Sequence, residues 1–145
     1  AMKFLAMRLM QIGLKVYLVG EVCTPSIREG DLLLVGSGSG ETAGMIAICK
    51  KAKAAGAEVA VFTKNRNSTI ASIAKVAVQL NTAKPIQEGA AGPDGWIEGN
   101  YFSIRPSGNP FEQSIVIVGD AMVCELMQKT NCGTAKIAYN HANLE

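Results

Sequence analysis

The chain has 145 residues, of which 48% are hydrophobic and 18% charged, and its formal net charge is +2. This is enough for one domain (1–145) with a single core, and the small charge and 6% aromatic content favour neither nucleic acid nor an anionic membrane as partner. Four cysteines without a CxxC pair, beside one histidine, do not suggest zinc. They indicate a reducing, cytoplasmic compartment, and no apolar run is long enough to span a bilayer.

The N-terminal residues read as a helix, a strand and a loop. The apolar pattern of residues 1–11 predicts a helix that Gly13 stops. The helix has no N-cap residue, which suggests that residues are missing upstream. Residues 15–20 read as a strand, and residues 21–29 read as a loop.

The middle of the chain alternates strands and helices. The expected elements are a strand at 32–35, a helix to Ala55 closed by Gly56, a strand at 58–63, a turn at 64–67, a helix at 69–75 with Ser68 as N-cap, and a strand at 76–80. The run at 32–35 does not alternate, so we expect both faces of that strand to be covered. Such alternation of elements predicts a parallel α/β sheet.

The C-terminal part contains a long loop and a long helix. Residues 81–110 hold four of the five prolines and read as a loop without regular structure. Residues 111–129 predict a helix with a broad apolar surface, followed by a short helix at 134–139 and a polar tail. Cys49 and Cys124 fall in helical patterns and are expected to be buried free thiols.

The stretch Ser37-Gly38-Ser39-Gly40-Glu41-Thr42 follows a predicted strand and begins a helix. Its glycines allow a sharp turn, and the hydroxyls of Ser37, Ser39 and Thr42 stand beside the free N–H groups of a helix N-terminus. This combination predicts an anion site that suits phosphate, although a plain serine-glycine turn would give the same pattern. A dinucleotide site is the least favoured alternative, because the stretch has no GxGxxG spacing.

Ligands of parallel sheets bind beyond the carboxyl ends of the strands, where both the 37–42 stretch and the 65–68 turn are expected. Glu112 in the first turn of the long helix fits a carboxylate placed against the helix dipole, and His141 fits an exposed side chain in a polar tail. Glu41 is expected to point away from a phosphate. Arg66 could reach a phosphate, but a position on a surface loop is favoured for it.

The chain resembles the 6-phospho-3-hexuloisomerase family of the sugar isomerase (SIS) domain superfamily. The resemblance rests on five stretches: 3–13 (KFLAMRLMQIG), 20–25 (GEVCTP), 37–42 (SGSGET), 106–113 (PSGNPFEQ) and 141–145 (HANLE). It implies a flavodoxin-like three-layer α/β sandwich with a central parallel sheet. It also implies a homotetramer that uses neither a metal nor a redox cofactor.

The activity that the resemblance implies is the reversible interconversion of 3-hexulose 6-phosphate and fructose 6-phosphate in the ribulose monophosphate pathway. The carbonyl moves between C2 and C3 through an enediolate, so one base must move a proton between these carbons. Glu112, with a pKa raised by partial burial, is the expected base, and His141 is expected to move protons at the sugar oxygens. Ser37, Ser39 and Thr42 would bind the phosphate, with Ser68 as a helper.

The sequence departs from the family pattern in three places. The family has a strand and a second glycine-serine loop before the first helix, and both are absent here. We therefore expect either a longer protein, which we favour, or a truncated inactive form whose sheet lacks its first strand. Residues 84–105 form a longer segment than usual, and Ser107 replaces a methionine. Two alternative functions remain: a non-catalytic phosphosugar-binding domain, and another phosphosugar isomerase such as arabinose 5-phosphate isomerase.

Overall fold

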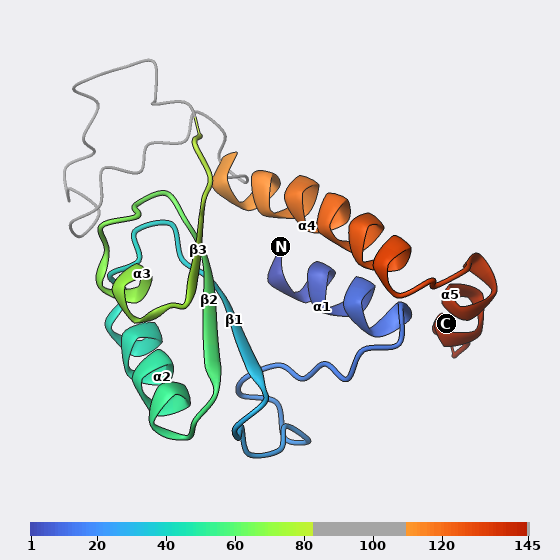
Figure 1. Ribbon diagram of the computed structural model, residues 1–145, viewed down its shortest axis with the longest axis horizontal. Coiled ribbons are helices and arrows are strands. Elements are labelled where there is room, and N and C mark those ends of the chain that lie inside the picture. The colour runs from blue at the N-terminus through green and yellow to red at the C-terminus, as the bar shows by residue number, and fades with distance from the viewer. Residues whose placement is uncertain (83–109, 145) are drawn as a thin grey trace. The chain divides into compact units, whose positions relative to one another are not determined.

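The computed structural model describes residues 1–82 and 110–144, which form two compact units (Figure 1). One unit comprises Ala1–Ser26 and Ile115–Glu145, and the other comprises Ile27–Ser114. The elements are α1 (Met2–Gln11), β1 (Leu32–Gly36), α2 (Ala43–Ala54), β2 (Glu58–Thr63), α3 (Thr69–Ile73), β3 (Val76–Gln79), α4 (Pro110–Lys129) and α5 (Thr134–Asn140). The predicted loop at 81–110 lies almost wholly outside the described residues.

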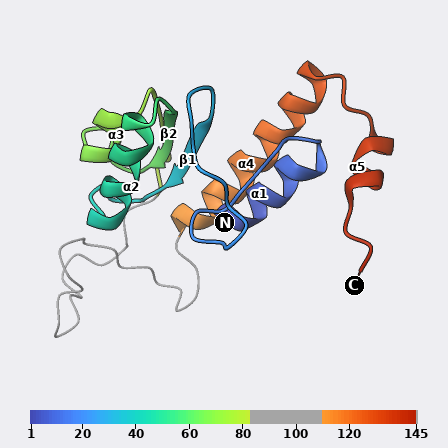
Figure 2. The same ribbon diagram turned by 90° about the horizontal axis from the view of Figure 1, so that it is seen from below.

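The unit at 27–114 contains a parallel sheet with the strand order β1-β2-β3. The register pairs Leu33 with Val59 and Val35 with Val61, and β2 pairs with β3 along its other edge. Figure 2 shows α2 and α3 on one side of this sheet. The predicted α/β class with parallel strands is thereby confirmed for the described part of the chain.

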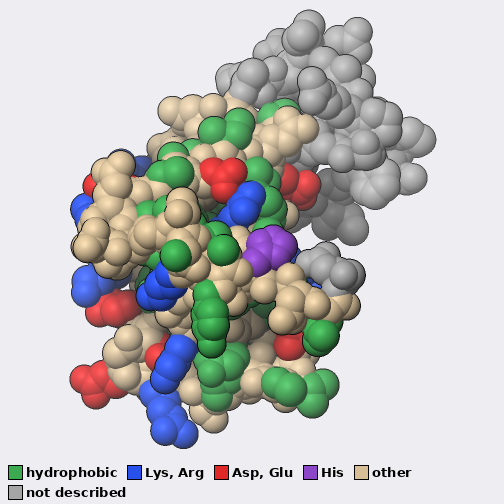
Figure 3. All heavy atoms as spheres, turned by 90° about the vertical axis from the view of Figure 1, so that its right-hand side faces the viewer, with side chains coloured by type: hydrophobic (Ala, Val, Ile, Leu, Met, Phe, Trp, Pro, Cys, Tyr) green, Lys and Arg blue, Asp and Glu red, His purple; other side chains and the backbone are tan. Residues whose placement is uncertain are grey.

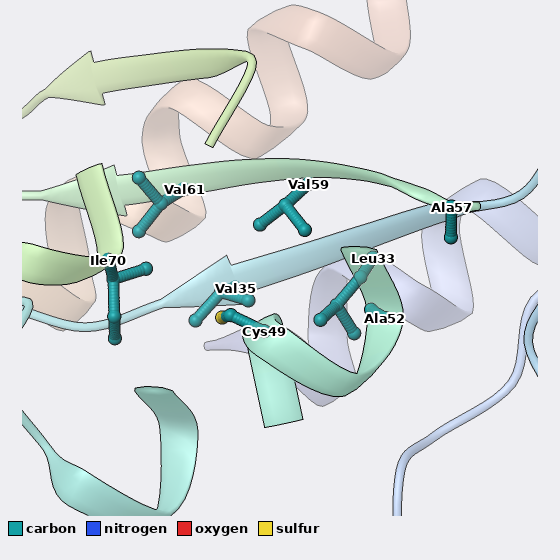
Figure 4. Packing of buried hydrophobic residues seen from close by; sticks show 8 residues of the cluster. All are labelled: Leu33, Val35, Cys49, Ala52, Ala57, Val59, Val61 and Ile70. Atoms are coloured by element: carbon teal, nitrogen blue, oxygen red, sulfur yellow. The ribbon is translucent and has the colours of Figure 1, made fainter. Parts of the chain in front are cut away.

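The core of this unit lies between the sheet and the two helices (Figure 4). Its fully buried members include Val59, Cys49 and Ile70, each 0% exposed. Burying a valine or isoleucine side chain of this kind contributes about 1.5–3 kcal/mol relative to exposure. Burial also raises the pKa of the Cys49 thiol, because an apolar environment disfavours the thiolate, so the predicted buried thiol is confirmed at Cys49.

Exposure alternates along β1, contrary to the prediction of a strand covered on both faces. Leu33 and Val35 are buried in the core, whereas Leu32 is 60% exposed. The apolar run at 32–35 gave no sign of this difference, because its residues have the same chemical character on both faces.

The helix predicted at 69–75 is shorter than expected. It ends at Ile73, because the Lys75 N–H donates to the Val59 carbonyl (2.8 Å) as β3 begins.

The predicted strand at 15–20 is wrong: this segment has no regular structure. Tyr17 and Val19 are 55% and 62% exposed. The carbonyl of Leu18 accepts hydrogen bonds from the N–H of Glu21 and the hydroxyl of Thr24, so it is used within a local turn. A strand needs a neighbouring strand for its backbone groups, and no described strand pairs with this segment.

The other unit is built from α1, α5 and the part of α4 from Ile115 onward. Leu5 is buried, and a Cβ on Gly119 would lie 3.2 Å from its Cδ1, so α1 and α4 approach closely there. The side-chain amide of Asn140 donates to the Gln11 carbonyl (3.0 Å), which joins the end of α5 to the end of α1. The helices predicted at 1–11, 111–129 and 134–139 are confirmed as α1, α4 and α5.

The broad apolar surface predicted for α4 includes residues that are exposed in the described chain. Ile115 and Val123 are buried, but Ile117 is 70% exposed. Cys124 is exposed, so the prediction that it is a buried thiol is wrong. An apolar pattern that surrounds a helix does not tell which side is covered, and Cys124 lies on an uncovered side.

Candidate active site

The residues that connect β1 to α2, Ser37–Thr42, fold back on themselves; we call them the anion loop. Ser37 is buried, and its backbone N–H donates to the Phe62 carbonyl at 3.0 Å, which continues the pairing of β1 with β2. Its Oγ accepts a hydrogen bond from the Gly40 N–H at 3.1 Å. The Oγ of Ser39 accepts another from the Glu41 N–H at 3.2 Å. Both hydroxyls keep their own hydrogen for donation to a ligand.

Several backbone donors of the anion loop remain available. The N–H groups of Gly38, Ser39 and Thr42 donate to no other residue within 1–82 and 110–144. Thr42 is the N-cap of α2, and its side chain makes no capping hydrogen bond. Because the N-terminus of a twelve-residue helix also carries partial positive charge, these donors suit an anion such as phosphate.

Gly40 has no room for a side chain. Its φ is +69°, and a Cβ there would lie 2.0 Å from the Oγ of Ser68. Its carbonyl accepts a hydrogen bond from the Ile70 N–H at 3.0 Å. Ser68 is buried, and its Oγ accepts from the Ala71 N–H at 3.3 Å, so the predicted N-cap is confirmed. The anion loop therefore rests directly on the first turn of α3.

Glu41 is turned to the N-terminus of α3. Its Oε1 accepts a hydrogen bond from the backbone N–H of Thr69 at 2.7 Å. Hydrogen bonds from Thr69, first from its backbone N–H and then from its side chain, lower the pKa of this exposed carboxyl. They favour the carboxylate and give Glu41 a structural role that its position in sequence did not reveal.

We expect Glu41→Gln to lower the thermal stability at neutral pH and to have little effect in acid. A lowered pKa means that the stabilisation by Glu41 is complete above the ordinary glutamate value of 4.5 and is lost as pH falls below it. Tm measured from pH 3 to pH 7 for both proteins tests this. Glu29→Gln is the control, because that exposed side chain makes no hydrogen bond or ion pair within the described residues. A Tm difference for Glu41→Gln that does not change with pH would contradict this role.

Thr63, the last residue of β2, and Lys64, which follows it, contact the anion loop, and sequence analysis singled out neither. Thr63 is fully buried, and its Oγ1 lies 3.3 Å from the Gly38 carbonyl oxygen and accepts from the Asn65 N–H at 3.1 Å. The backbone N–H of Lys64 also donates to the Gly38 carbonyl, at 3.0 Å. The register that pairs Gly36 with Phe62 brings these positions together. A sequence signal existed: they lie at the carboxyl end of the adjacent strand.

The first turn of α4 contacts the anion loop through Phe111. A Cβ on Gly38 would lie 3.5 Å from Cδ1 of the buried Phe111 ring. Glu112 is the next residue, and it lies in the first turn of α4, as predicted. Its side chain is exposed, so the expected partial burial is not found among the described residues.

His141 lies in the unit that contains α1 and α5, where it is the C-cap of α5. Its ring is exposed, and Nδ1 lies 3.0 Å from the carbonyl oxygen of Ala142. Figure 3 shows the histidine side chain at the molecular surface. Ser37, Ser39, Thr42, Ser68 and Glu112 all belong to the other unit.

The described residues contain no group of three or more His, Cys, Asp or Glu side chains that could hold a metal ion. None of the helices described is both long enough and apolar enough to cross a membrane. Among the described residues, the anion loop offers backbone N–H groups and hydroxyls, and the side chains of Lys64 and Phe111 lie beside Gly38.

A SIS domain family model matches residues 3–93, which include the anion loop. The chain therefore belongs to the SIS domain family. Within it, the chain is 37% identical over 143 residues to 3-hexulose-6-phosphate isomerase of Bacillus subtilis, covering 99% of this chain and 72% of the relative. It is likewise 37% identical over 144 residues to 3-hexulose-6-phosphate isomerase of Mycobacterium gastri, covering 99% and 67%. These relatives place it in the 3-hexulose-6-phosphate isomerase family.

A solved structure agrees with this assignment. A protein of Methanococcus jannaschii, whose crystal structure was taken to infer a function as 3-hexulose-6-phosphate isomerase, aligns with a TM-score of 0.80 and 29% identity. The alignment covers 99% of this chain and 71% of that one. The family predicted from the five sequence stretches is thus confirmed.

Proposed function

We propose that this protein is an isomerase that interconverts 3-hexulose 6-phosphate and fructose 6-phosphate. The observation that carries the proposal is the contact of Phe111 with Gly38, which brings the first turn of α4 to the anion loop. Glu112 follows Phe111 in that turn and belongs to the same unit as the anion loop, which supports its role as the base. The 3-hexulose-6-phosphate isomerases to which the chain is 37% identical support this substrate class.

The phosphate is bound by the anion loop. The N–H groups of Gly38 and Ser39 and the hydroxyls of Ser37, Ser39 and Thr42 donate hydrogen bonds to its oxygens. Ser68 helps by keeping the loop in place, because it fills the space beside Gly40. Binding at a fixed anion site leaves the carbons of the open-chain sugar free to align with a base.

The reaction needs one base that serves two neighbouring carbons. Starting from fructose 6-phosphate, Glu112 removes the proton at C3, and the electrons of the C–H bond form the 2,3-enediolate. The same carboxyl group then returns the proton to C2, which leaves the carbonyl at C3. His141 transfers the proton between the two sugar oxygens, a step that suits an imidazole near neutral pH.

The cellular setting follows from the same proposal. The enzyme acts in the cytoplasm as a homotetramer, takes part in the ribulose monophosphate pathway, and the chain contributes a single SIS domain to it. The exposed apolar side chains on α4, including Ile117, supply surface that an interface between copies would cover. No metal or redox cofactor takes part in the proposed steps.

Incubation of the complete protein with 3-hexulose 6-phosphate tests the proposal. We expect fructose 6-phosphate to accumulate to a fixed equilibrium ratio, and the same ratio to be reached from the other side. Arabinose 5-phosphate serves as the comparison substrate, because its isomerisation moves the carbonyl group between C1 and C2 instead. Binding of the hexulose phosphate without turnover, or preferred turnover of arabinose 5-phosphate, would overturn the proposal.

A further inference from the structure

The backbone of Lys64 is held on both sides by hydrogen bonds. Its N–H donates to the Gly38 carbonyl of the anion loop at 3.0 Å. Its carbonyl accepts a hydrogen bond from the Nε2 of Gln79, the last residue of β3, at 3.2 Å. The position of Lys64 is thus fixed relative to the loop, independently of its side chain.

The side chain of Lys64 extends over the anion loop. Its Cε lies 3.2 Å from the position that a Cβ on Gly38 would occupy, and the ammonium group is one bond further. Gly38 is one of the residues whose N–H is available to a ligand. An anion bound there would therefore lie within reach of the ammonium group. A lysine is suited to this contact, because it offers a compact charge with three rotatable donors.

The surroundings of Lys64 disfavour its charged form. Its side chain is partly buried, and desolvation lowers its pKa, because the charged ammonium loses contact with water. A bound dianion would compensate for this loss by favouring the charged form. Arg66, in the same turn, is exposed, and its charge remains in contact with solvent.

We propose that Lys64 binds the phosphoryl group of the sugar phosphate together with the anion loop. The inference rests on the proposed function for its substrate class, and it adds the cation that neutralises part of the phosphate charge. An ionic contact made equally in the ground state and the transition state contributes to substrate affinity and leaves the chemical step unchanged.

The test compares Lys64→Met with the matched variant Arg66→Met, which removes the same charge from the same turn. We expect Lys64→Met to raise KM for fructose 6-phosphate about 10- to 100-fold with kcat changed less than about twofold, and Lys64→Arg to retain most of the affinity. Arg66→Met should behave like the unchanged protein. An unaltered KM in Lys64→Met, or an equal rise in both methionine variants, would overturn the inference.

Calorimetric binding separates this inference from the proposed function, because it needs no turnover. The dissociation constants of fructose 6-phosphate and inorganic phosphate should both rise in Lys64→Met by a similar factor. If only the fructose 6-phosphate constant rises, Lys64 contacts the sugar and the inference is wrong. A protein that binds both ligands through Lys64 but never isomerises the sugar would refute the function and leave the binding role in place.

Discussion

Replacing Glu112 by glutamine is expected to lower kcat about 10²- to 10⁴-fold, the range in which a positioned general base contributes. The amide has nearly the shape of the carboxylate but does not accept the proton from C3. Binding should persist, because the anion loop and Phe111 are unchanged, so the dissociation constant of fructose 6-phosphate should stay within about threefold. Steady-state kinetics in both directions and calorimetric binding measure the two effects.

Glu125→Gln is the matched control for this prediction. Glu125 lies on the same helix, is exposed, and pairs with Lys129 at 3.3 Å, so its substitution removes one carboxylate from α4. A surface ion pair of this kind contributes only about 0–1 kcal/mol, and turnover should remain that of the unchanged protein. Normal turnover in Glu112→Gln, or an equal loss in Glu125→Gln, would mean that Glu112 is not the base.

Replacing Gly40 by alanine is expected to lower the free energy of unfolding by about 2–5 kcal/mol. The left-handed backbone at φ +69° costs an L-residue about 1–2 kcal/mol, and the overlap with Ser68 at 2.0 Å adds about 1–3 kcal/mol of strain. Affinity for fructose 6-phosphate should fall as well, because the anion loop must move away from α3. Denaturant unfolding and calorimetry measure the two losses.

Substitutions at two other glycines separate the backbone cost from the cost of the overlap with Ser68. Gly30 has φ +87° and nothing within 4 Å of its would-be Cβ, so Gly30→Ala carries the backbone cost without the overlap. Gly44 lies in α2 with open space around it, and Gly44→Ala should stabilise the helix by about 0.5–1 kcal/mol. If Gly40→Ala is no less stable than Gly30→Ala, the close contact with Ser68 does not exist in solution.

Features set by local sequence could be predicted. The strand at 58–63, the N-cap at Ser68 and the helix stop at Gly56 were confirmed, because each depends on side-chain periodicity or on one residue's own conformational preference. The anion loop belongs with them, since a strand, a glycine-rich turn and a helix follow one another along the chain. The family was predicted from the resemblance of five short stretches, and not from physical rules.

Features set by contacts between distant segments could not be predicted. Residues 15–20 have the composition of a strand but no partner strand among the described residues. Glu41 reaches Thr69, 28 residues further on, and the proximity of Lys64 to Gly38 depends on the register of β1 with β2. The exposure of Cys124 could not be predicted without knowing which side of α4 is covered. The roles of Glu112 and His141 remain predictions.

The most direct measurement of the central claim locates deuterium taken up by fructose 6-phosphate in D₂O. Proton transfer between C2 and C3 through an enediolate predicts that the complete protein exchanges the proton at C3 for deuterium while 3-hexulose 6-phosphate appears, both followed by NMR. An isomerase that moves the proton between C1 and C2 would label C1 instead. Labelling at C1, or tight binding with neither exchange nor product, would contradict the account.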